Sequence, residues 1–86
     1  MKRYFKSDEC YFEYDGERAV RQVEVKNGYW RRSAEDLRRH SLTKRPLSVI
    51  STDGRMHEID VEEFEAIWRE AIQAEYNQAL KRSERK

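Results

Sequence analysis

The side chains that could hold a metal ion are few in this sequence and lie far apart. His40, His57 and Cys10 are its only histidines and its only cysteine. Structural zinc sites gather such residues at short spacings, for example C-x-x-C, and no such spacing occurs here. We therefore expect no metal site and no cofactor, and we interpret both histidines as surface residues.

The same residues give little support for catalysis. A cysteine acts as a nucleophile when a base such as histidine lies beside it. Cys10 instead opens a run of aromatic residues, and free cysteine usually behaves as a small buried hydrophobe. Phosphate-binding loops need several glycines close together, whereas the three glycines of this chain stand in separate turns. We therefore expect no catalytic residues and no enzyme activity.

The clearest cluster of charge is a basic segment between residues 29 and 45. It joins two aromatic residues to six cationic ones: Tyr29, Trp30, Arg31, Arg32, Arg38, Arg39, Lys44 and Arg45. Cations bind the phosphates of nucleic acid, and aromatic rings stack on its bases. The alternative is that Arg31 pairs with Glu24, that Trp30 is core, and that the remainder is a solvated loop.

A hairpin must position the start of this segment. Residues 18–26 and 29–32 are joined by Asn27-Gly28, a dipeptide typical of type I′ turns because both positions need positive φ. A two-residue loop then sets two favourable facing pairs: Val25 with Trp30, and Glu24 with Arg31. The sequence therefore predicts an antiparallel hairpin.

Alternation along the strands assigns their residues to two faces of a sheet. Residues 10–15 form a further strand, which ends at Asp15-Gly16. One face is predicted to be the core: Cys10, Phe12, Tyr14, Val23, Val25 and Trp30. The other is predicted to face water: Tyr11, Glu13, Val20, Gln22, Glu24, Lys26, Tyr29 and Arg31. Arg21 also falls on the core face, where it would have to reach a carboxylate or the sheet edge.

The remaining segments outside the C-terminal helix have weaker patterns. Residues 33–36 resemble a capping box, which predicts one or two helical turns through Leu37 to His40. Pro46 is expected to end any helix there. Residues 47–50 and 56–59 flank Thr52-Asp53-Gly54, as a second short hairpin or as a loop packed down by its apolar residues. Residues 3–6 are interpreted as an edge strand.

The C-terminal helix has the strongest pattern. Asp60 is the expected N-cap, with Glu63 completing a capping box. Apolar residues follow at helical spacing: Val61, Phe64, Ile67, Trp68, Ala71, Ile72, Ala79 and Leu80. A helix of roughly 30 Å exceeds strands of about 20 Å, so we expect the turns from Tyr76 to Leu80 to overhang the sheet. That overhang would need the middle segment or a partner chain to cover it.

Composition limits the chain to one small domain, residues 1–86, with 81–86 expected to be a frayed basic tail. Only 37% of the 86 residues are hydrophobic and 41% are charged, but a net charge of +1 and 12% aromatic residues favour folding. The predicted fold is α+β: an antiparallel β-meander of three to five strands packed against one long C-terminal amphipathic helix. A lone cysteine suits a reducing compartment, and no apolar run has the length of a membrane helix. We therefore expect a cytoplasmic protein that does not enter a membrane.

Two stretches together resemble a known family. They are Tyr14-Asp15-Gly16 followed by R-x-V-E-V at residues 21–25, and E-E-F-E-x-x-W at residues 62–68. This arrangement is similar to a group of small bacterial domains of unknown function. The resemblance covers roughly two thirds of the chain and omits residues 31–45 and the basic tail. Its motifs are structural and the family has no assigned activity, so it implies a fold and no site residues.

Exclusion of chemistry leaves a protein-binding role as the leading hypothesis: an adaptor, an immunity-type partner or a homo-oligomer. The predicted surface is the outer sheet face with the adjoining arginines, because interfaces favour tyrosine and arginine: Tyr11, Val20, Tyr29, Arg31, Arg32, Arg38 and Arg39. Alternatively, these are strand formers on a wet face, or residues 42–50 partly cover them. The second hypothesis is single-stranded nucleic-acid binding, of RNA above all, through residues 29–45.

Overall fold

The computed structural model describes residues 1–37 and 42–84, which form a five-stranded antiparallel sheet and two helices. The strands are β1 (Lys2–Lys6), β2 (Cys10–Asp15), β3 (Arg18–Lys26), β4 (Tyr29–Ala34) and β5 (His57–Ile59), and the helices are α1 (Leu47–Ile50) and α2 (Val61–Glu84). The strand order is β4-β3-β2-β1-β5. The predicted α+β fold, a meander with one long C-terminal helix, is confirmed.

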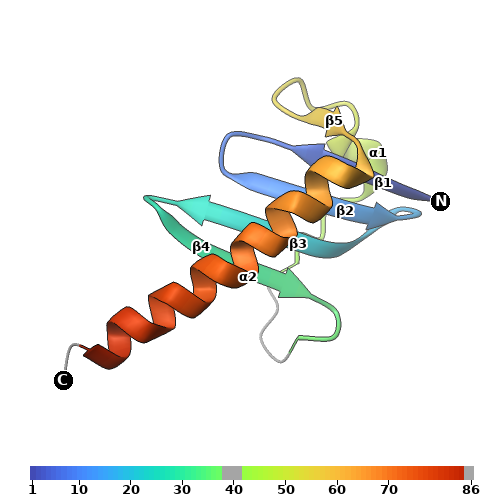
Figure 1. Cartoon of the computed structure of the whole chain (residues 1–86). Coiled ribbons are helices and arrows are strands. Elements are labelled where there is room, and N and C mark those ends of the chain that lie inside the picture. The colour runs from blue at the N-terminus through green and yellow to red at the C-terminus, as the bar shows by residue number, and fades with distance from the viewer. Residues whose placement is uncertain (38–41, 85–86) are drawn as a thin grey trace.

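The two helices lie on opposite faces of the sheet. The long α2 runs obliquely across one face, and its C-terminal turns extend past the sheet (Figure 1). The short α1 closes the other face, where Ile50 packs with Phe5, Phe12 and Tyr14. The 24 residues of α2 span about 36 Å. This helix explains why the molecule measures 46 Å in one direction and 23 and 20 Å in the others.

The predicted hairpin between β3 and β4 is confirmed. Asn27 and Gly28 both have positive φ, 54° and 76°, as a type I′ turn requires. Val25 lies opposite Trp30, and Glu24 lies opposite Arg31. The turn chemistry therefore sets the register of this half of the sheet.

A β-bulge makes the predicted face assignment wrong for β2. Glu13 lies opposite Arg21 but Tyr14 lies opposite Ala19, so Val20 is an extra residue on β3. An extra residue shifts the register by one and moves the facing side chains to the other face. As a result Tyr11 lies opposite Val23 rather than Gln22.

Neither face of the sheet is the wet face that we expected. The α2 side carries Tyr11, Glu13, Arg21, Val23, Val25, Trp30 and Arg32, whereas the other side carries Cys10, Phe12, Tyr14, Ala19, Gln22 and Glu24. Partly buried Leu47 and Met56 pack on that second side. Residues 47–50 therefore cover part of a sheet face, as one alternative expected, but this is not the face that carries Tyr11.

The segment before α1 also differs from its prediction. Ser33 and Ala34 are buried and end β4, and residues 35–36 form a turn, so no helix begins at Ser33. Pro46 precedes the helical turn of α1 rather than ending a helix, which its fixed φ permits. Tertiary burial of Ser33 and Ala34 overrides the local capping pattern. His40 lies outside the described residues.

The N-terminal strand is not an edge strand, because β5 pairs with it on the side away from β2. Residues 47–50 and 56–59 therefore do not form a hairpin with each other. The loop alternative is closer to the structure, since Ile50 is fully buried.

The long helix begins as predicted. The backbone N–H of Glu63 donates to Asp60 Oδ1 at 2.8 Å, so Asp60 is the N-cap. The helix continues to Glu84, so residues 81–84 are helical, whereas we expected a frayed tail. Within the described residues, no helix has the length and apolar character to cross a membrane.

Candidate protein-binding surface

A charged layer fills part of the space between the sheet and α2. Glu13 is only 2% exposed and accepts hydrogen bonds from the guanidinium of Arg21, which also donates to Glu65 of α2 at 2.9 and 3.0 Å. Burial alone would raise the pKa of Glu13, but hydrogen bonds from Arg21 and Tyr4 outweigh it and the pKa falls below its ordinary value. Hydrogen bonding to Glu13 raises the pKa of Arg21. The predicted need of Arg21 for a carboxylate is confirmed.

Trp68 of α2 joins this layer to β4. The guanidinium carbons of Arg21 and Arg32 lie 4.9 and 5.0 Å from the Trp68 ring centroid, within cation–π range. Arg32 also forms an ion pair with Glu75 at 2.7 Å. These contacts use both arginines to fix α2 on the sheet.

Three of the six cationic side chains of the basic segment are paired with carboxylates of the protein itself. Arg31 pairs with Glu24 at 3.0 Å, and Arg45 pairs with Asp53 at 2.9 Å. With Arg32 bound to Glu75, three of its arginines already have carboxylate partners. Arg38 and Arg39, which we predicted to be binding residues, lie outside the described residues.

The predicted tyrosine patch is not assembled. Tyr11 lies opposite Val23 on the α2 side, and Val20 occupies the bulge. Tyr29 is 50% exposed, but alternation puts it on the side opposite Trp30. Its hydroxyl accepts a hydrogen bond from Arg82 at 3.2 Å. These three residues therefore belong to different surfaces.

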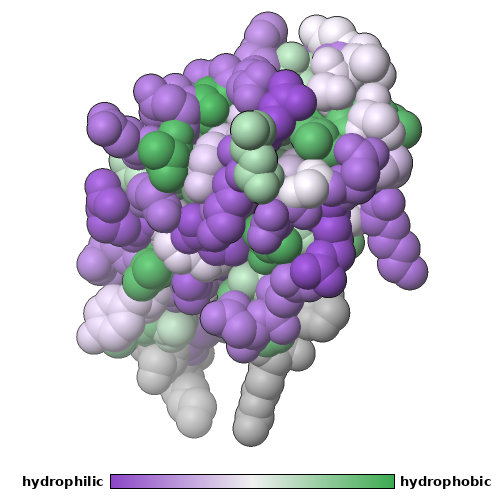
Figure 2. Space-filling view, turned by 90° about the vertical axis from the view of Figure 1, so that its right-hand side faces the viewer, coloured by the Kyte–Doolittle hydropathy of each residue, from purple (hydrophilic) through white to green (hydrophobic). Residues whose placement is uncertain are grey.

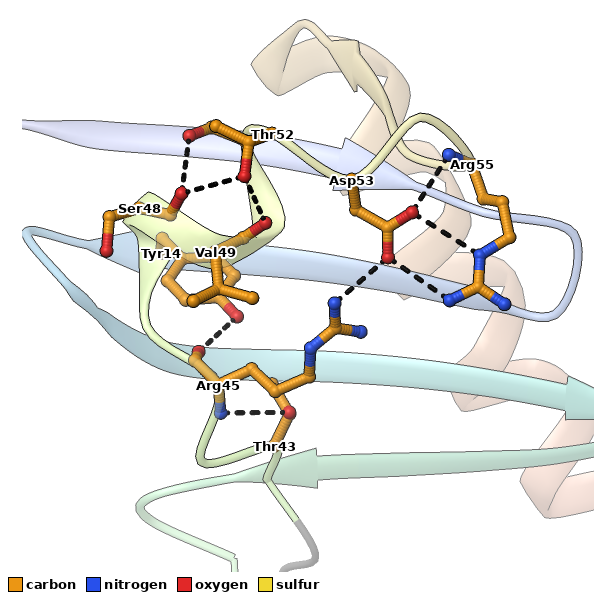
Figure 3. Close-up of polar contacts among 9 residues, drawn as sticks. Tyr14, Thr43, Arg45, Ser48, Val49, Thr52, Asp53 and Arg55 are labelled. Atoms are coloured by element: carbon orange, nitrogen blue, oxygen red, sulfur yellow. Dashed lines mark hydrogen bonds and ion pairs between the residues drawn. The ribbon is translucent and has the colours of Figure 1, made fainter.

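A second polar cluster braces the loop that follows α1 (Figure 3). Asp53 accepts hydrogen bonds from Arg55 and Arg45, and those from Arg55 contribute most to lowering its pKa. The Tyr14 hydroxyl donates to the Arg45 carbonyl at 2.8 Å, and burial raises its pKa to about 12. The cluster is thus tied to the core and satisfied internally.

Cys10 borders a cavity of about 360 Å³ beside this cluster. Burial, followed by the charges of Glu24 and Glu9, raises the pKa of its thiol, which suits a neutral side chain rather than a nucleophilic thiolate. His57 is exposed on β5. Among residues 1–37 and 42–84, no three His, Cys, Asp or Glu side chains gather as metal ligands would.

The outer edge of β4 is covered by side chains of α2. The Trp30 N–H donates to Gln78 Oε1 at 2.7 Å, and Gln78 Nε2 donates to the Trp30 carbonyl at 2.9 Å. The Arg32 N–H donates to Glu75 Oε2 at 2.8 Å. Gln78 and Glu75 thereby take the place of a neighbouring strand, which protects an edge that could otherwise pair with another chain. The sequence carried no signal for this role, since both residues look like solvated helix positions.

One surface of α2 remains apolar and unpartnered within the described structure. Ile72, Tyr76 and Leu80 are 45, 60 and 45% exposed; because they are four residues apart they form one row, which we name the α2 ridge. The helical turn α1 packs on the other side of the sheet and does not cover this row. The side of the molecule around the start of α2 instead shows hydrophobic residues scattered singly among hydrophilic ones (Figure 2).

The α2 ridge is the surface that our predicted site omitted, although its signal was present in the sequence. Apolar residues continue at helical spacing beyond the length of the strands, and we expected Tyr76 and Leu80 to need a cover. The alternation of residues along the strands instead favoured a site on the sheet.

Comparison with protein-family models, with characterised proteins and with solved structures gives no significant match. The resemblance to small bacterial domains of unknown function therefore stays a prediction.

Proposed function

We propose that this chain is a non-catalytic protein-binding module and that its docking surface is the α2 ridge. The observation that carries the proposal is the exposure of Ile72, Tyr76 and Leu80 in one row, on a helix whose C-terminal turns extend past the sheet (Figure 1). Grouped apolar side chains in water mark interaction sites more often than isolated ones do. Tyrosine is also among the residues that contribute most to binding energy at interfaces.

The protonation states of Glu13, Asp53 and Cys10 favour structural roles for these side chains over catalytic ones. Glu13 and Asp53 are held ionised by arginines, and the Cys10 thiol is kept neutral by burial. General acids and bases need pKa values near the working pH, and these groups are shifted away from it. A half-buried single cysteine also fits a reducing compartment, so we place the module in the cytoplasm.

The shape of the surface indicates the kind of partner. A row of residues four apart fits the grooves of another helix, the commonest mode of helix packing in globular proteins. Addition of a partner strand is disfavoured at β4, because Gln78 and Glu75 occupy its outward backbone groups. The partner is therefore expected to present an apolar helix.

Site-specific photo-crosslinking tests this proposal. A photoreactive phenylalanine replaces Tyr76 in the cells from which the chain comes. In the control variant it replaces Asn77, which is exposed. Asn77 points about 100° away from Tyr76 around the axis of α2. We expect a protein adduct from position 76 and none from position 77. Leu80→Asp should abolish the adduct. Equal adducts at both positions, or none at 76, would reject the α2 ridge as a docking surface.

A further inference from the structure

We infer that the helix docked on the α2 ridge is the α2 of a second copy of this chain, antiparallel to the first, with the two-fold axis at Tyr76. This inference rests on the proposed function and names its partner. Two-fold dimers use the same patch on both subunits, so the patch must complement itself. Three properties of the α2 ridge meet that condition.

The first property is its spacing. Ile72 and Leu80 lie four residues before and after Tyr76. An antiparallel dyad at Tyr76 therefore places Ile72 opposite Leu80 of the second copy, twice, with the two Tyr76 rings in contact between them. Every large apolar side chain of the row then meets another one, and no polar residue is forced into the centre.

The second property is its charge. The α2 ridge carries no charge, and its neighbours Gln73 and Asn77 are neutral and hydrogen-bonded to each other, so two copies meet without repulsion at the centre. With the dyad at Tyr76, Glu70 of each copy lies at the level of Arg82 of the other copy. Antiparallel helices set opposite charges and opposite helix dipoles side by side. A parallel pair would oppose like charges, so the antiparallel arrangement is favoured.

The third property is access. Ala71, which is fully buried, and Gln78, which bonds to Trp30, mark the side of α2 that faces the sheet. At about 100° per residue, Tyr76 points roughly 140° away from Ala71 and 160° from Gln78. The C-terminal turns of α2 also extend beyond the sheet (Figure 1). A second helix can therefore approach without meeting the strands of the first copy.

The expected dimer is weak. Three exposed side chains and their neighbours fall short of the ~800 Å² per partner of a standard interface, which suggests a dissociation constant on the order of 10–100 µM. Sedimentation equilibrium should therefore show the apparent mass rising from one chain toward two over this range. Tyr76→Asp should keep the chain at the mass of one copy. Val49→Asp adds the same charge at an exposed apolar residue of α1, on the other side of the sheet, and should leave the rise unchanged.

Disulfide trapping tests the geometry, in a Cys10→Ala background. Helix axes about 8–10 Å apart, with Cα atoms about 2.3 Å from each axis, put facing Cα atoms at roughly 3.5–5.5 Å, which overlaps the range for disulfides. The Tyr76→Cys variant should form a disulfide-linked dimer by itself. The Ile72→Cys and Leu80→Cys variants should form a disulfide with each other when mixed, and neither should form a dimer when it is alone. Asn77→Cys is the control.

The outcomes separate this inference from the function on which it rests. Self-crosslinking of Ile72→Cys and Leu80→Cys alone would overturn the antiparallel dyad. A mass of one copy at about 1 mM, well above the expected dissociation constant, would overturn self-association. If an adduct with a different protein still forms at position 76 in cells, the docking surface stands and only the identity of its partner is wrong. With no adduct at all, both fall.

Discussion

Arg21 shows how a chain so rich in charge builds an interior. Its guanidinium bonds to Glu13 on the neighbouring strand and Glu65 on α2, and it lies 5.0 Å from the Phe64 ring centroid. A guanidinium group is planar, so its face can stack on an aromatic ring while the N–H groups at its edge bond to carboxylates. The ammonium group of lysine cannot do both. Arg21 thereby replaces an apolar side chain between the two layers. Within the described residues, no buried side-chain nitrogen or oxygen lacks a partner.

The buried pair predicts a dependence of stability on pH. The pKa of Glu13 is lower in the folded chain than in the unfolded one. Ionised Glu13 therefore stabilises the fold fully above about pH 4.3, and this stabilisation is lost as the pH falls through the pKa of Glu13 in the folded chain. Glu13→Gln leaves Arg21 with one carboxylate partner fewer, and we expect it to cost about 3 kcal/mol at pH 7. The difference from the unmodified protein should shrink as the pH falls from 5 to 2.5.

Urea unfolding across that pH range measures both quantities. The control is Glu62→Gln, since Glu62 is exposed on the first turn of α2, and it should change the free energy of unfolding by less than about 0.5 kcal/mol. If Glu13→Gln costs the same at pH 2.5 as at pH 7, ionisation of Glu13 does not hold the layers together.

At the scale of elements, the β3–β4 turn depends on its glycine. Gly28 has φ 76°, a region that costs other residues about 1–2 kcal/mol and β-branched residues more. Gly28→Val should therefore lower stability by about 2 kcal/mol or more. Gly54→Val should have little effect, because Gly54 needs no positive φ and a Cβ there meets open space. Thermal unfolding of the two variants makes the comparison, and equal melting temperatures would contradict it.

The elements that could be predicted from sequence are those with a local signal. Asn27-Gly28 strongly favours a type I′ turn, and Asp60 caps α2 through its own side chain, so both were predictable. The bulge at Val20 has no such signal, because alternation looks the same with or without an extra residue. That single residue reversed the predicted faces of β2 relative to β3. Pairing of β5 with β1 joins residues more than 50 positions apart, and no short pattern encodes it.

The cover of the β4 edge predicts a specific local change. In Gln78→Ala the Trp30 N–H and carbonyl lose their protein partners, which should cost about 1–2 kcal/mol and speed hydrogen exchange of the Trp30 amide. Gln73→Ala is the matched control, because that side chain bonds to Asn77 on the exposed side of α2. Unchanged exchange at Trp30 in Gln78→Ala would show that the glutamine does not protect the edge.

At the scale of the whole molecule, candidate sites were harder to predict than the fold. A sequence shows where the charged residues are, but it does not show which of them form ion pairs with each other in the fold. Arg32 and Glu75 are 43 positions apart and yet form a 2.7 Å pair. The α2 ridge was visible as a pattern, but only the structure shows that α1 packs on the opposite face and that, among the described residues, these side chains stay exposed.

That internal neutralisation decides our expectation for nucleic acid. Arg31, Arg32 and Arg45 would have to leave Glu24, Glu75 and Asp53 to reach phosphates, so each contact would carry the loss of an ion pair. We expect no micromolar binding of mixed single-stranded RNA or DNA at physiological salt, as measured by fluorescence anisotropy across a salt series. A true site would lose affinity with log salt by roughly 0.7 per phosphate contact, and alanine at both Arg38 and Arg39 would flatten that slope. Micromolar affinity with such a slope would make the basic segment the functional site in place of the α2 ridge.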